Sequence, residues 1–202
     1  MGKYEKYNFK RFLHIASVVL GFEGGFSDDP DDAGGKTNLG VTEGTLYEAY
    51  KRGIVAHYDV KKLTRKEALH IYFEMFWIPS HAYEIPDPLG FCVFDLAING
   101  GPGRAIITLQ QTVNGILEKQ ISEDGGFGPQ TRTALEEILS KFIPGMQDWP
   151  TILSQVFLLE RVEFYDDITD GEANTLKKRE QEIRNRKFLR GWIRRVIKQR
   201  AW

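Results

Sequence analysis

The chain has 202 residues, of which 42% are apolar and 27% are charged, and its formal net charge is −1. These values are typical of a globular protein with one large domain or two small ones. The single cysteine, Cys92, excludes an intramolecular disulfide framework, and its apolar surroundings predict a buried thiol. The four histidines have no spacing or cysteine partners that would hold zinc, so no metal site is predicted.

The N-terminal segment superficially resembles a secretory signal, because basic residues precede the apolar run 12–22. However, His14 and Ser17 interrupt that run, and no small-residue cleavage site precedes Glu23. The apolar residues of 9–20 instead recur at helical spacing, which predicts a packed helix that is not cleaved. No other segment approaches the roughly 18 apolar residues that a membrane-spanning helix needs.

The remaining pattern is helical along almost the whole chain, so we predict a mainly α-helical fold. Thr64 and Glu67 form a capping box, and Pro102 and Pro129 suit first helical turns. The expected helices are 8–22, 42–53, 64–76, 88–99, 102–114, 129–142, 150–168 and 187–199. The polar segment 26–41 lacks helical periodicity and allows a short hairpin. We expect regions 1–90 and 91–202 to pack together as one compact body.

The charge is unevenly spread along the chain. Residues 177–202 contain eleven Lys or Arg and two Glu, so this tail carries +9 and the rest of the chain −10. This asymmetry indicates an anionic partner or a charge-separated surface. The apolar stripe of helix 187–199 commits one of its faces to packing, and no base-reading motif accompanies the charge, so nucleic acid is not the expected partner.

Glu23 is the candidate catalytic acid. It lies where the first helix should end, and a carboxylate at the negative end of a helix dipole is disfavoured as an anion. Phe22 and Phe26 would raise its pKa further by desolvation, and Gly24-Gly25 lets a ligand approach closely. This combination suits a proton donor to a glycosidic oxygen, although a solvated residue at a helix end is the alternative.

A glycosidase normally uses a second carboxylate, and the following loop offers four aspartates. Asp32 directly precedes Ala33-Gly34-Gly35 and is best placed to be held by a rigid turn. The other three resemble solvated surface charges: Asp28, Asp29 and Asp31. A calcium loop beginning at Asp29 is disfavoured by its register, since Ala33 would stand at the fifth position and Gly40 at the twelfth.

Five other residues are candidates for contact with a sugar. Thr37 and Asn38 follow the loop and can either bind a sugar or fix the backbone. Tyr72 and Trp77 belong to an aromatic group at the end of helix 64–76, and such residues either build a core or line a cleft. Asn99 stands at another helix end, beside Gly100-Gly101.

These motifs resemble glycoside hydrolase family 108, the lysozyme-like N-acetylmuramidases of phage endolysins and bacterial secretion-activator proteins. The resemblance is carried by two groups of residues in the first half, Glu23-Gly24-Gly25-Phe26 and Asp32-x-Gly34-Gly35-x-Thr37-Asn38-x-Gly40-Val41-Thr42. The second half resembles the companion peptidoglycan-binding region of that family. Its matching blocks are Phe94-Asp95-x-Ala97-x-Asn99-x-Gly101-Pro102-Gly103-Arg104-Ala105, Leu109-Gln110, Asp124-Gly125-x-Phe127-Gly128-Pro129-x-Thr131 and Lys187-Phe188-Leu189-Arg190-Gly191-Trp192.

The resemblance implies a lysozyme-like helical fold that cleaves the β-1,4 bond between N-acetylmuramic acid and N-acetylglucosamine. It implies that Glu23 is the catalytic acid, that Asp32 is the second carboxylate, and that no metal or cofactor is needed. The expected partner is the glycan strand of peptidoglycan, and the basic C-terminal helix could meet an anionic wall polymer or membrane surface. We expect a monomer, made in a bacterial cytoplasm and released to the periplasm or wall. A lytic transglycosylase and a catalytically silent wall-binding or secretion-assisting protein are the alternatives.

Overall fold

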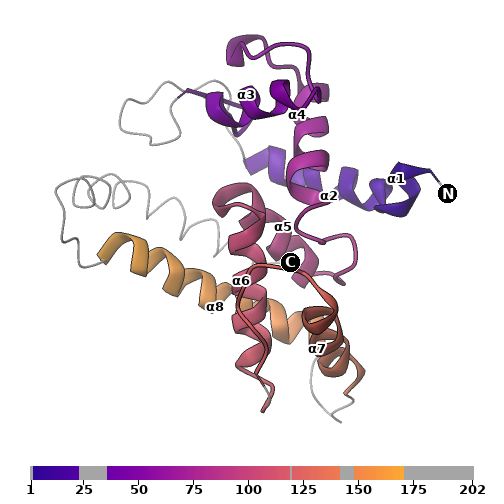
Figure 1. Cartoon of the computed structure of the whole chain (residues 1–202), viewed down its shortest axis with the longest axis vertical. Helices are drawn as coiled ribbons and strands as arrows, with labels where there is room; N and C mark the ends of the chain where they lie inside the picture. Colours follow the sequence, from indigo (N-terminus) through magenta and orange to yellow (C-terminus); the bar gives the residue numbers. More distant parts are fainter. Residues whose placement is uncertain (1, 23–35, 119, 142–147, 171–202) are drawn as a thin grey trace. The chain divides into compact units, whose positions relative to one another are not determined.

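The computed structural model describes residues 2–22, 36–118, 120–141 and 148–170, and the described part is mainly α-helical (Figure 1). The chain divides into two compact units, Met1–Pro79 and Ser80–Trp202, and each is described here by itself. The predicted fold class is thereby confirmed, including a short hairpin at the end of the polar segment. The predicted helix 187–199 lies outside the described residues.

The first unit contains short helices around one small hairpin. Its elements are α1 (Lys3–Lys6), α2 (Phe9–Phe22), β1 (Thr37–Asn38), β2 (Val41–Thr42), α3 (Glu43–Lys51), the 3₁₀ turn η1 (Val60–Lys62), α4 (Arg65–Tyr72) and the π-helical turn η2 (Phe73–Trp77). Thr42 accepts a hydrogen bond of 3.1 Å from the Thr45 amide and so caps α3, as the sequence predicts.

The core of the first unit is aromatic. The Phe12 ring of α2 lies 5.1 Å from Phe73 and 5.7 Å from Trp77, and all three side chains are fully buried. The predicted helix 64–76 is α-helical only to Tyr72 and continues as the π-helical turn η2. Phe73 and Trp77, the first and last residues of this turn, are both buried in the core.

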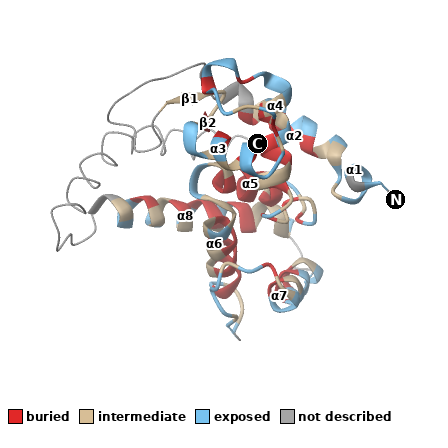
Figure 2. Cartoon of the chain, turned by 45° about the horizontal axis from the view of Figure 1, so that its top comes forward, coloured by how far each residue is buried: buried red, intermediate tan, exposed pale blue. Residues whose placement is uncertain are grey.

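The second unit is a bundle of four described helices. They are α5 (Leu89–Gly100), α6 (Pro102–Asn114), α7 (Pro129–Ser140) and α8 (Trp149–Asp170). Helices α5, α6 and α8 pack on one another, and α7 packs on α6 and α8. Helix α5 is buried from Leu89 to Ala97 (Figure 2). This stretch includes Cys92, whose burial is confirmed, and desolvation raises the pKa of its thiol to about 12.

A buried ion pair joins α5 to α8. Arg161 Nη2 lies 2.8 Å from Asp95 Oδ2, and neither side chain is exposed. Arg161 Nε also donates a 2.8 Å hydrogen bond to the Tyr165 hydroxyl. Burial by itself would lower the pKa of Arg161, but the Asp95 charge and the Tyr165 contact raise it, so the guanidinium stays charged. The two helices are therefore tied by a charge-assisted contact in the core.

None of the described helices has the length and apolar character of a membrane span.

We predict that breaking the buried pair strongly destabilises the second unit. In Arg161→Met the Asp95 charge stays buried without its cation, which should lower the free energy of unfolding by about 3–5 kcal/mol. The double variant Asp95→Asn/Arg161→Met removes both charges and should recover part of that loss. Urea unfolding followed by circular dichroism measures both changes.

Arg132→Met is the matched control, because Arg132 pairs with Glu84 at 2.7 Å where both side chains are partly exposed. That pair should contribute at most about 1 kcal/mol. An Arg161→Met variant no less stable than Arg132→Met would contradict the structural role of the buried pair.

Candidate functional site

Both proposed catalytic carboxylates lie in the segment 23–35, outside the described residues. The assignments of Glu23 and Asp32 therefore remain predictions. The structure does describe the elements on either side of this segment. Helix α2 ends at Phe22, and the chain is described again from Lys36, just before the hairpin β1–β2. The two ends of the candidate catalytic loop are thus attached to defined secondary structure.

The hairpin has a two-residue turn. Thr37 pairs with Thr42 and Asn38 with Val41, which leaves Leu39 and Gly40 as the central residues. Both have positive φ, 51° and 74°, which is the pattern of a type I′ turn. This conformation costs nothing at glycine but is unfavourable for leucine, so tertiary contacts must hold Leu39 in place.

Three contacts hold the hairpin on the body of the first unit. The Tyr72 hydroxyl, from the end of α4, donates a hydrogen bond to the Leu39 carbonyl. The Asn38 side-chain amide donates to the Val60 carbonyl at 3.0 Å. Val41 is 1% exposed and belongs to the core. The chain is therefore fixed firmly at the point where it leaves the candidate catalytic loop.

Thr37 and Asn38 were predicted as either sugar ligands or backbone supports. Both side chains are half-buried in the hairpin. The bond from Asn38 to Val60 shows that its amide supports the backbone in the described conformation. For Thr37 the structure shows only its place in the strand, opposite Thr42, and its contact with a sugar remains a prediction.

Tyr72 and Trp77 are core residues. Tyr72 is 1% exposed and Trp77 is fully buried, with its indole N–H donating to the Tyr7 carbonyl at 2.7 Å. A sugar ring could reach either aromatic face only if the core opened. The Tyr72 hydroxyl instead supports the hairpin through its hydrogen bond to the Leu39 carbonyl. The sequence could not reveal this role because the two residues are 33 positions apart.

Asn99 belongs to the second unit, where it lies near the end of α5 with an exposed side chain. Its amide donates a 2.6 Å hydrogen bond to the Asp95 carbonyl one helical turn earlier. A role of Asn99 toward substrate remains a prediction.

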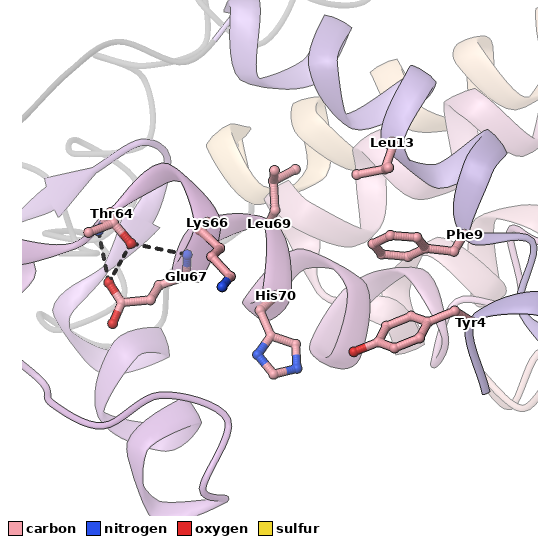
Figure 3. Close-up of a pocket in the computed structure, with 8 residues that line it drawn as sticks. All are labelled: Tyr4, Phe9, Leu13, Thr64, Lys66, Glu67, Leu69 and His70. Atoms are coloured by element: carbon pink, nitrogen blue, oxygen red, sulfur yellow. Dashed lines mark hydrogen bonds between the residues drawn. The ribbon is translucent and has the colours of Figure 1, made fainter. Parts of the chain in front are cut away.

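The first unit also contains a pocket of about 750 Å³ between its N-terminal helices and α4 (Figure 3). Tyr4, Phe9 and Leu13 line one side, and α4 with its N-cap provides the rest: Thr64, Lys66, Glu67, Leu69 and His70.

Glu67 is the only carboxylate among the residues that line this pocket, and it is engaged in the capping box. It accepts hydrogen bonds from the Thr64 amide at 3.0 Å and the Thr64 hydroxyl at 2.7 Å, and His57 Nε2 lies 3.3 Å away. These contacts, led by Thr64, lower the pKa of Glu67. A general acid needs a raised pKa, so this pocket does not have the chemistry of an acid centre.

Among the described residues, no group of three or more His, Cys, Asp or Glu side chains is placed to hold a metal ion.

The comparisons with known proteins agree with the helical architecture. Residues 16–101 match the family model described as Glycosyl hydrolase 108, and residues 104–197 match the model described as Predicted Peptidoglycan domain. A solved structure described as that of Brucella abortus SagA is 27% identical, with a TM-score of 0.70 over 95% of this chain and 92% of its own. No curated protein matches the chain.

A hydrolase region followed by a peptidoglycan region defines a lysozyme-like peptidoglycan hydrolase. The first half of the chain is thus similar to glycoside hydrolase family 108, and the second half to a predicted peptidoglycan domain. Its first matched region contains both sequence motifs of the candidate catalytic loop.

We predict opposite effects for two substitutions at the hairpin. Tyr72→Phe removes the donor to the Leu39 carbonyl and should lower the free energy of unfolding by about 1 kcal/mol. Leu39→Asn places a residue that tolerates positive φ in the turn and should raise it by up to about 1 kcal/mol. Urea unfolding measures both.

Tyr4→Phe is the control for loss of a hydroxyl, because the Tyr4 side chain is 52% exposed. It should change stability by less than about 0.5 kcal/mol. Equal effects of Tyr72→Phe and Tyr4→Phe would show that the hairpin does not depend on the Tyr72 hydroxyl.

Proposed function

We propose that this protein is an N-acetylmuramidase that hydrolyses the β-1,4 bond between N-acetylmuramic acid and N-acetylglucosamine in peptidoglycan. The observation that carries the proposal is the match of residues 16–101 to the glycoside hydrolase family, because this region includes Glu23-Gly24-Gly25 and Asp32-x-Gly34-Gly35. Glu23 is the proposed acid and Asp32 the proposed second carboxylate.

The proposed chemistry follows from the place of Glu23 in the chain. It is the first residue after α2, where the helix dipole disfavours a negative charge, and Phe22 and Phe26 are its apolar neighbours in sequence. A carboxyl group with a raised pKa stays protonated near neutral pH and can donate its proton to the leaving glycosidic oxygen. As the bond from the sugar carbon to that oxygen breaks, Asp32 would stabilise the oxocarbenium-like charge or activate water.

The anchored hairpin supports this proposal from the structural side. A proton donor contributes only when it is held within hydrogen-bond reach of its target. The segment 23–35, which carries the proposed carboxylates, is followed in the sequence by a hairpin held by Tyr72 and Asn38.

Glu23→Gln should abolish most activity while leaving the fold intact. The amide keeps the shape of the side chain but cannot deliver the proton, so the rate should fall about 100-fold or more. The measurement is clearing of a turbid suspension of purified peptidoglycan. Equal clearing by wild type and Glu23→Gln would overturn the role of Glu23.

The neighbouring aspartates supply controls in the same assay. Asp32→Asn should lower the rate strongly, whereas the same substitution at Asp28, Asp29 or Asp31 should not. Mass spectrometry of the products tests the reaction itself, because hydrolysis yields reducing ends. Products with 1,6-anhydro ends would identify a lytic transglycosylase, and binding without any products would identify a silent wall-binding protein.

We also propose that the protein acts as a monomer in the periplasm or wall, where its basic C-terminal segment contacts an anionic polymer or membrane surface. The support is the net charge of +9 on residues 177–202. Replacing Arg194, Arg195 and Lys198 with Gln should weaken binding to peptidoglycan at low salt. The difference should shrink at high salt because salt screens charge attraction. A salt-independent difference would contradict an electrostatic contact.

A further inference from the structure

Three tyrosines form an exposed aromatic cluster on the first unit, here called the tyrosine platform: Tyr47, Tyr50 and Tyr58. Their exposed fractions are 47%, 42% and 59%. The Tyr58 ring lies 5.8 Å from Tyr47 and 5.3 Å from Tyr50, so it contacts both. Only six large apolar or aromatic side chains are strongly exposed among the described residues, and half of them gather in this cluster.

Buried residues of α3 and of the connection after it hold the tyrosine platform in place. In α3, Leu46 and Ala49 are fully buried, so the adjacent Tyr47 and Tyr50 lie on the solvent side of the helix. Tyr58 comes from the connection after α3, which is held on both sides of it by the buried Val55 and Val60. The rings are therefore arranged before any partner binds, which reduces the entropy cost of binding.

Two structural links join the platform to the hairpin that ends the candidate catalytic loop. Helix α3 begins directly after β2, so Tyr47 and Tyr50 lie roughly 8–12 Å along the helix from Thr42. On the other side, Asn38 of the hairpin bonds to the Val60 carbonyl, two residues after Tyr58. The platform therefore adjoins the hairpin at which the described chain resumes after the segment 23–35.

The chemistry of the platform fits a glycan better than an apolar partner. Its exposed rings have apolar faces that can stack on the C–H faces of sugar rings, and each carries a hydroxyl that can hydrogen-bond. The polar residues beside the rings include Glu48 and Lys51, which pair at 2.6 Å, and Lys51 Nζ lies 5.1 Å from the Tyr47 ring centre. The six strongly exposed side chains include only two aliphatic ones, Leu13 and Leu159, and neither belongs to this cluster.

We propose that the tyrosine platform is an accessory binding surface for the glycan strand of peptidoglycan, beyond the sugars that are cleaved. The proposal rests on the proposed function, because it takes the muramidase substrate as the polymer that crosses this face. It adds a site that holds the strand through ring stacking.

The test compares binding in the Glu23→Gln background, where the strand is not cut. The probe is soluble, peptide-free glycan released from peptidoglycan by an amidase, titrated by calorimetry. Replacing Tyr47, Tyr50 and Tyr58 together with Ala should weaken binding about tenfold or more, since aromatic anchors dominate binding energy. The triple Phe variant keeps the rings and should stay within about threefold of the parent.

Two single variants outside the platform are matched controls, Tyr4→Ala and Leu159→Ala, with parent side chains 52% and 53% exposed. Both should bind like the parent, and circular dichroism of every variant checks that the fold is retained. A triple Ala variant that is folded and binds as tightly as the parent would overturn the proposal.

Two further outcomes would also overturn it. If intact peptidoglycan binds through the tyrosines but peptide-free glycan does not, the platform recognises stem peptides. If size-exclusion chromatography shows a dimer that the triple Ala variant dissociates, the platform is an interface between copies of this chain. Cleavage of peptidoglycan is measured separately with the wild-type protein. A protein without hydrolase activity is thereby distinguished from one that does not bind glycan at the tyrosine platform.

Discussion

The anchoring of the hairpin is the constraint on which the candidate site depends. The Tyr72 hydroxyl donates a hydrogen bond to the Leu39 carbonyl, and the Asn38 side-chain amide donates one to the Val60 carbonyl. Leu39 has a positive φ, a conformation that leucine does not favour by itself. These bonds transmit the rigidity of α4 and η1 to the point where the candidate catalytic loop ends. On the other side of the segment 23–35, α2 is held by Phe12, which is buried in the aromatic core. The described elements that flank this segment therefore depend on the packing that stabilises the first unit.

The two units are stabilised by different physical means. The first has an aromatic core in which Phe12, Phe73 and Trp77 bring α2 and η2 together. The second combines an apolar core with the buried pair between Arg161 and Asp95. Both charges of such a pair must lose their hydration, so its net contribution to stability is smaller than the cost of breaking it. The pair joins α5, within the matched region 16–101, to α8, within the matched region 104–197.

Much of the secondary structure could be predicted because its signals are local. The helix predicted over 102–114 has the observed bounds, and the capping box of Thr64 and Glu67 forms as expected. The predicted helix 64–76 differs in its last turn, which is π-helical from Phe73 to Trp77. Tyr72 was predicted either to contact a sugar or to build the core, and in the structure it is a core residue whose partner, the Leu39 carbonyl, could not be predicted. Hydrogen bonding to a carbonyl 33 residues away leaves no local pattern.

The sequence by itself determined the helical fold class, the resemblance to glycoside hydrolase family 108 and the two motif groups that contain Glu23 and Asp32, because periodicity, capping and motif spacing are properties of neighbouring residues. Only the tertiary structure decided that Trp77 is part of the core, that Asp95 forms an ion pair with Arg161, and that the Tyr58 ring contacts the two tyrosines of α3. Each of these facts depends on burial or on contact between residues from separate elements. Such contacts arise only when the chain folds, because packing sets which distant side chains meet.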